Sequence, residues 1–172
     1  MEQKITTPAV KGLLISLVMI IFGIIVYFAG QIENQGLSSL QYVILFGGII
    51  WSCITYAKQM NGNVTFGNVF GHGFKTTAAI AAIMAVYTFI SVKFLFPDIV
   101  DKSIEAARKN MQEQNLSDSQ MQTALDITRK FFLPFAIGGL LLFFAIAGCI
   151  ASLIGAAVAK KNPQSQNPFE KQ

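Results

Sequence analysis

The sequence predicts an all-α fold: an integral membrane four-helix bundle with a polar helical hairpin between transmembrane helices 3 and 4. Three observations predict it. Only 13% of the 172 residues are charged, against about 25% in soluble domains. The apolar residues gather in four long runs, and nearly all charged residues fall between or beyond them. The third gap between these runs, residues 97–130, is long enough for two polar helices.

Each of the four runs is long enough to cross a bilayer as a helix, which takes roughly 20 residues. The runs contain no Asp or Glu, and their basic residue is Lys93. We expect one membrane domain, residues 1–160, with spans at about 12–30, 40–57, 76–96 and 131–159. As a helix the last run would measure about 43 Å, more than a hydrocarbon core of about 30 Å. It must therefore tilt, bend near Pro134 or protrude.

The first run is expected to remain in the protein as a span. It exceeds the roughly 7–15 apolar residues of a signal peptide, and no small-residue cleavage site follows it. The positive-inside rule then predicts that both termini face the cytoplasm. The connection 31–39 carries no Lys or Arg, whereas both tails and the second connection carry lysines. Five basic residues within 97–130 oppose this orientation, but the short connections give the clearer signal.

Residues 97–130 are predicted to form a solvated helical hairpin. Its first helix would have a narrow apolar stripe, because Val100, Ile104, Ala107 and Met111 recur at helical spacing. Its second helix would start at the SxxQ pattern that begins at Ser117, the spacing of a capping box. The polar, proline-containing segment 161–172 is predicted to be a disordered tail.

The glycine-rich run NGNVTFGNVFGHGFKTT, residues 61–77, matches neither a phosphate-binding nor a metal-binding motif. Phe74 separates Gly73 from Lys75, which breaks the P-loop pattern. Thr76 stands where a dinucleotide-binding loop needs its third glycine. The chain's one histidine, His72, has no Asp or Glu in the same connection, so we expect no metal site there.

The same run predicts a structural elbow at the cytoplasmic interface. Phe66, Phe70 and Phe74 share one face of a short amphipathic helix, and His72 would be an interfacial polar residue. Small residues predict where helices pack closely. The candidates are Gly67 and Gly71 in this run, and Gly148, Ser152 and Gly155 in the last span.

The segment TFGNVFGHGFKTT, the four runs and the polar insert together carry a family resemblance. The chain resembles the bacterial membrane family catalogued as domain of unknown function 4199. In that family a Thr/Ser-Phe-Gly…Phe…Gly-Phe segment leads into an apolar helix, and MQEQNLSDSQMQTAL is similar to its polar helical insert. The resemblance covers roughly residues 8 to 160. It implies a multi-pass protein of the bacterial cytoplasmic (inner) membrane, typical of Bacteroidota, and it implies no activity.

No catalytic constellation stands out in the sequence. Ser/His/Asp, Cys/His and paired intramembrane carboxylates are all missing, so we expect no catalytic, cofactor-binding or metal-binding residues. The lipid bilayer is the expected environment. We expect a non-enzymatic protein that acts by packing with itself, as a homo-oligomer, or with another membrane protein. The alternative is an oligomeric transporter or channel component, with Lys93 as its polar site.

Two further features point away from other functions. The net charge of +4 does not indicate nucleic acid as a partner, because the basic residues lie at helix ends. Cys53 and Cys149 both fall inside spans, where a small buried hydrophobe is a commoner role than a disulfide or a metal ligand.

Overall fold

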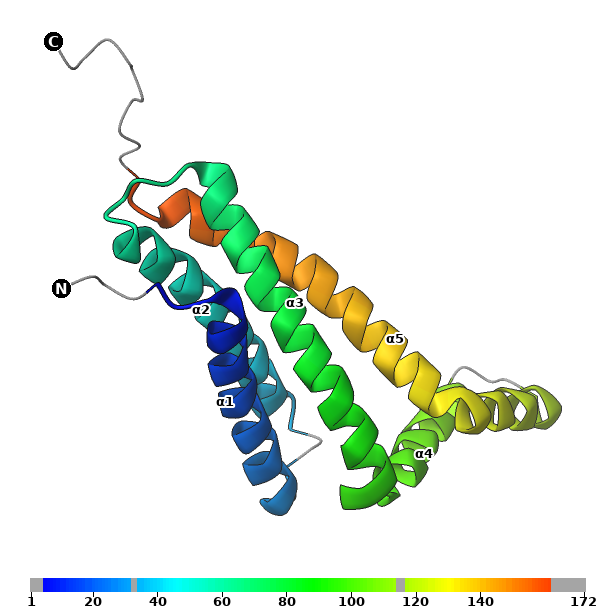
Figure 1. The fold of residues 1–172 in the computed structure, drawn as a ribbon. Helices are drawn as coiled ribbons and strands as arrows, with labels where there is room; N and C mark the ends of the chain where they lie inside the picture. Colours follow the sequence, from blue (N-terminus) through cyan, green and yellow to red (C-terminus); the bar gives the residue numbers. More distant parts are fainter. Residues whose placement is uncertain (1–4, 32–33, 114–116, 162–172) are drawn as a thin grey trace, which may run out of the picture. The chain divides into compact units, whose positions relative to one another are not determined.

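The computed structural model describes residues 5–31, 34–113 and 117–161, and every regular element in these ranges is a helix (Figure 1). The elements are α1 (Pro8–Phe28), α2 (Gln35–Gln59), α3 (Phe66–Ile90), the short π-helix η1 (Ser91–Leu95), α4 (Asp98–Glu113) and α5 (Asp118–Val158). The prediction of an all-α fold is confirmed. The predicted polar tail lies outside the described residues from residue 162 onward.

Four helical stretches are long and apolar enough to cross a membrane: Pro8–Phe28, Ser39–Gln59, Phe66–Leu95 and Asp118–Val158. A helix satisfies its own backbone hydrogen bonds. A membrane-spanning segment must do so because the hydrocarbon core of the bilayer offers no water as a partner. The chain is therefore a multi-pass membrane protein.

All four spanning helices begin earlier than the apolar runs that predicted them, and α2 does so at Gln35. Helix α1 starts at Pro8, where proline needs no hydrogen-bond partner, and the Thr7 hydroxyl accepts a hydrogen bond from the Val10 amide at 3.3 Å. Helix α3 starts at Phe66, so the expected elbow forms the first turns of the third span itself. Helix α5 continues for 41 residues through Pro134 without a break. At this length it measures about 60 Å.

The chain divides into two compact units. The first comprises Met1–Ile83 with Phe143–Gln172, and the second comprises Met84–Leu142. Helices α3 and α5 contribute to both. The first unit therefore holds α1, α2, most of α3 and the last turns of α5, and it contains the buried side chains discussed below.

Helices of the first unit approach one another at glycines. A Cβ atom built on Gly12 of α1 would lie 2.7 Å from Ala79 Cβ of α3, and one on Gly148 of α5 would lie 2.7 Å from Thr77 Cβ. Such distances are too short for any side chain, so these contacts depend on glycine. Close approach of this kind is how membrane helices gain packing energy, because lipid tails do not drive them together.

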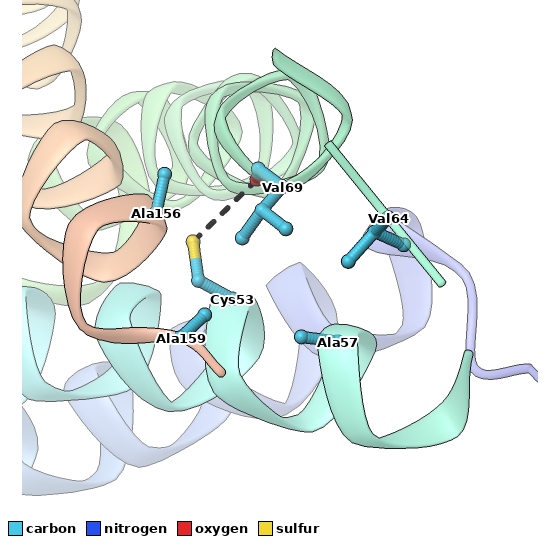
Figure 2. Packing of buried hydrophobic residues seen from close by; sticks show 6 residues of the cluster. All are labelled: Cys53, Ala57, Val64, Val69, Ala156 and Ala159. Carbon is cyan, nitrogen blue, oxygen red and sulfur yellow. Dashed lines mark hydrogen bonds between the residues drawn. The ribbon is translucent and has the colours of Figure 1, made fainter. Parts of the chain in front are cut away.

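Where α2, α3 and α5 meet, six residues form a buried cluster (Figure 2). They are Cys53, Ala57, Val64, Val69, Ala156 and Ala159. The Cys53 thiol donates a hydrogen bond to the Val69 carbonyl at 3.7 Å. Most members are small, so the backbones can lie close together at this end of the first unit.

Helix α2 ends in a tight hydrogen-bonded turn. The Gly62 amide donates to the Ala57 carbonyl at 2.8 Å, and the Asn61 amide donates to the Lys58 carbonyl at 3.0 Å. These two bonds define a Schellman motif, which needs a left-handed residue just after the helix. Asn61 supplies it with φ 53°, because asparagine tolerates this conformation better than most residues do. The carbonyls of Ala57 and Lys58 are thereby satisfied.

The second unit contains the polar hairpin, made of α4 and the first part of α5. The Arg129 guanidinium contacts the Asp101 carboxylate at 2.6 Å, joining the two helices. Both side chains are largely exposed, so this ion pair adds little stability. At the start of α5, the Ser117 amide donates to Gln120 Oε1 at 3.3 Å, which is one half of the expected capping box.

Candidate functional site around Lys11

Lys11 is the largest fully buried side chain of the described residues, with 1% of its surface exposed. It lies in the first turn of α1 and reaches across to α2. Its ammonium Nζ donates hydrogen bonds to the Ser52 carbonyl oxygen at 3.1 Å and to Thr55 Oγ1 at 2.8 Å. Helices α1 and α2 are thus joined by a charged donor inside the bundle.

Hydroxyl groups continue this polar contact into α3. Ser52 Oγ lies 3.0 Å from Thr76 Oγ1, and Thr76 Oγ1 donates to the His72 carbonyl at 2.9 Å. We call Lys11, Ser52, Thr55, Thr76 and His72 the Lys11 cluster. It connects the N-terminal turns of α1 and α3 with the C-terminal half of α2.

His72 is buried, with 6% of its surface exposed, and its ring stacks on Tyr56 with centroids 4.1 Å apart. Its Nε2 atom has no hydrogen-bond partner among the described residues. A pocket of about 240 Å³ lies beside it. This pocket is lined by Pro8, Tyr56, Gly67, Asn68, Gly71, His72 and Lys75.

No acidic side chain balances Lys11 in the described part of the first unit. Residues 5–31, 34–83 and 143–161 contain five lysines and no Asp or Glu. The ammonium is therefore held by neutral oxygens alone. Removing such a charge from water costs several kcal/mol, and each hydrogen bond to it returns about 1.5–3 kcal/mol. The arrangement fixes an ammonium group in place.

The predicted packing residues occupy two different environments. Inside the first unit lie Gly148, Ser152 and Gly155. A Cβ atom built on Gly155 would come within 2.8 Å of Cys53 Cβ. Ser152 packs against Gly73, since a Cβ atom built on Gly73 would lie 2.8 Å from Ser152 Oγ. Gly67 and Gly71 line the pocket beside His72, and a Cβ on Gly71 would meet nothing within 4 Å.

The remaining predicted residues lie on exposed surfaces or within α3. Phe66 and Phe74 are exposed, and Phe70 stacks on Phe74 with centroids 6.0 Å apart. Lys93 is exposed in η1 and makes no hydrogen bond or ion pair within the described residues. The structure thus brings His72 into the buried cluster and leaves Lys93 out of it.

Lys11 is the residue that the sequence analysis missed as a site. Because the first apolar run begins only at Gly12, the sequence places Lys11 among the lysines of the N-terminal tail. The sequence does hold a signal, since Thr7-Pro8 is the pattern of an N-cap followed by proline at the first helical position. A helix that starts at Pro8 places Lys11 on its first turn.

Replacing Thr55 with valine should lower the free energy of unfolding by about 1–3 kcal/mol, because the Lys11 ammonium loses an acceptor. In a Lys11→Met background the same change should cost much less. The coupling free energy of this double-mutant cycle should reach about 1.5 kcal/mol, above the average of about 0.6 kcal/mol for hydrogen bonds between membrane helices. Reversible unfolding in mixed micelles measures it.

Thr128→Val is the matched control for this cycle. The Thr128 hydroxyl donates to the carbonyl of Ala124 at 2.8 Å, within α5 of the second unit. Its coupling to Lys11→Met should be near zero. A Thr55 coupling equally near zero would show that the ammonium gains nothing from the hydroxyl.

One of the comparisons with known proteins identifies a family. Residues 11–161 match the model of a family described as Protein of unknown function (DUF4199). The search of curated proteins and the search of solved structures each returned no match. Because the family match covers most of the 172 residues, the chain belongs to this family of unknown function.

Proposed function

We propose that this chain is a non-enzymatic membrane protein that acts by packing with a second membrane-spanning chain, either another copy of itself or a different protein. One observation carries the proposal: Gly47 lies on an exposed surface of the membrane-spanning helix α2. A Cβ atom on Gly47 would meet nothing within 4 Å.

The residues one turn before and after Gly47 make this surface a notch. Val43 is 63% exposed and Trp51 is 48% exposed, and spacings of four place all three on one helix face. Small residues between larger ones allow a second helix to approach closely. Trp51 lies eight residues before the end of α2, or about 12 Å along the axis, away from the interfacial layer that tryptophan prefers. A partner helix would cover it.

The Lys11 cluster supports a non-enzymatic role. General acid–base or nucleophilic catalysis needs a base within hydrogen-bond reach of a nucleophile. In the described residues the His72 side chain stacks on Tyr56 and bonds to no hydroxyl or thiol, and the Cys53 thiol bonds to the Val69 carbonyl. The buried polar groups hold helices together.

Filling the notch should weaken association. An overpacked contact costs about 1–3 kcal/mol, so Gly47→Leu should reduce the association constant about 5- to 150-fold. Energy transfer between labelled copies in liposomes measures self-association. Co-purification after cross-linking in cells measures association with another protein.

Two glycines provide matched controls for Gly47→Leu. Gly23→Leu on α1 also enters open space and should leave association unchanged. Gly148→Leu collides with Thr77 and should destabilise the chain itself. A strictly monomeric protein in native lipid, with no cross-linked neighbour in cells, would refute the proposal. The proposal would also be refuted if Gly23→Leu reduced the association constant as much as Gly47→Leu does.

We further propose that the protein resides in a bacterial cytoplasmic membrane with both termini in the cytoplasm. The support is the placement of lysines: Lys11 lies in the first turn of α1, Lys58 in the last turn of α2, and Lys160 and Lys161 just after α5 ends. Fluorescent protein fused after Gln172 should then fluoresce, and alkaline phosphatase fused after Gln35 should be active. The reverse pattern would contradict this orientation.

The second candidate function is that of a component of an oligomeric transporter or channel. The buried Lys11 favours this function. Ionisable residues that face the interior of a membrane bundle often mark ion or substrate pathways. If Lys11 serves such a pathway, Lys11→Met should abolish flux into protein-containing liposomes. Lys93→Met, at an exposed lysine, should leave flux unchanged. Absence of flux from the wild-type protein in liposomes would remove this candidate.

A further inference from the structure

A pocket rich in lysine lies between the C-terminal ends of α2 and α5, both in the first unit. Its volume is about 780 Å³. We call it the lysine pocket, and it is lined by Ile54, Ala57, Lys58, Asn61, Gly62, Val158, Lys160 and Lys161. Figure 2 shows the same ends of the two helices side by side, marked by Ala57 and Ala159.

Two of the three pocket lysines have no partner within the described residues. The Lys161 ammonium donates to the Ala156 carbonyl and, at 3.1 Å, to the Ala159 carbonyl. Lys58 and Lys160 are exposed, and the described part of the first unit contains no Asp or Glu to pair with them. The pocket therefore carries positive charge that the described residues do not neutralise.

The helix ends at the pocket do not cancel this charge. A helix C-terminus carries about half a negative charge on its free carbonyls. At α2 the Ala57 and Lys58 carbonyls accept the Gly62 and Asn61 amides, and at α5 the Ala156 carbonyl accepts the Lys161 ammonium. These three carbonyls already have donors, while the Lys58 and Lys160 ammonium groups remain available to an anion in the pocket.

The pocket also joins a polar surface to an apolar one. Lys58 lies in the last turn of α2, and Val158, the last residue of α5, is 56% exposed. Ile54 lies one turn deeper along α2. Charged groups thus border apolar side chains where two spans end, and lipid phosphates meet acyl chains at the ends of membrane spans.

We propose that the lysine pocket binds an anionic phospholipid. Its phosphate would lie between the Lys58 and Lys160 ammonium groups, and its glycerol and upper acyl chains would contact Ile54 and Val158. A free phosphate ion offers the same charge but leaves the apolar wall unused. Basic pockets between membrane helices bind anionic head groups in this way. The assignment is independent of association through Gly47, which lies on a different part of α2.

Native mass spectrometry of the full chain in neutral detergent tests the assignment, with dioleoyl phosphatidylglycerol and dioleoyl phosphatidylcholine as probes. The spectra also report oligomeric state, so lipid binding and association are read separately. We expect one phosphatidylglycerol to be retained in preference to phosphatidylcholine. Lys58→Gln and Lys160→Gln should each raise the apparent Kd for phosphatidylglycerol about fivefold, the value of one lysine near an anionic surface.

Lys75→Gln is the matched control, because it removes an exposed lysine of the first unit outside the pocket. Lys75→Gln should change the apparent Kd for phosphatidylglycerol by less than twofold. Only Lys58→Gln and Lys160→Gln should raise this Kd. Equal retention of the two lipids, or an equal loss in Lys75→Gln, would overturn the proposal. Displacement of the lipid by millimolar inorganic phosphate would assign the pocket to a soluble anion and would also overturn it.

Discussion

Close approach of helix backbones is the constraint on which the first unit depends. Lipid tails solvate leucine as well as another helix does, so contact between spans must come from tight packing. Gly12 meets Ala79, Gly148 meets Thr77 and Gly155 meets Cys53 at distances that exclude a side chain. These contacts also position the polar groups. Because Gly12 lies against α3, its neighbour Lys11 is held at the junction of three helices, where its ammonium reaches α2.

The Lys11 cluster gives this packing a specific register. Apolar faces alone allow two helices to slide past one another, whereas an ammonium that must meet one carbonyl and one hydroxyl does not. Lys11 finds Ser52 and Thr55 only if α1 and α2 stand at one relative height. Its charge is not balanced by an acidic residue in the described part of the first unit. The same excess of lysine gives the ends of α2 and α5 their positive character.

Composition and apolar run length were enough to predict the fold class, the four spans and the polar insert. They could not place the helix ends, because a helix need not stop where its apolar residues stop. Lys11 was therefore assigned to a tail although Pro8 already starts α1. His72 was expected at the interface, and its burial depends on Tyr56, which lies on another helix. The π-helix at Ser91–Leu95 has no sequence signal of its own.

Helix α5 makes two of the close glycine contacts of the first unit. Gly148 lies against Thr77 of α3, and Gly155, seven residues further along α5, lies against Cys53 of α2. Each added or deleted residue between them would rotate one contact relative to the other by about 100°. A change of seven residues nearly restores the original direction, with an error of only about 20°. The spacing between the two contacts is thus fixed by helical geometry. Only insertions or deletions of about seven residues would keep both contacts on the same face of the helix.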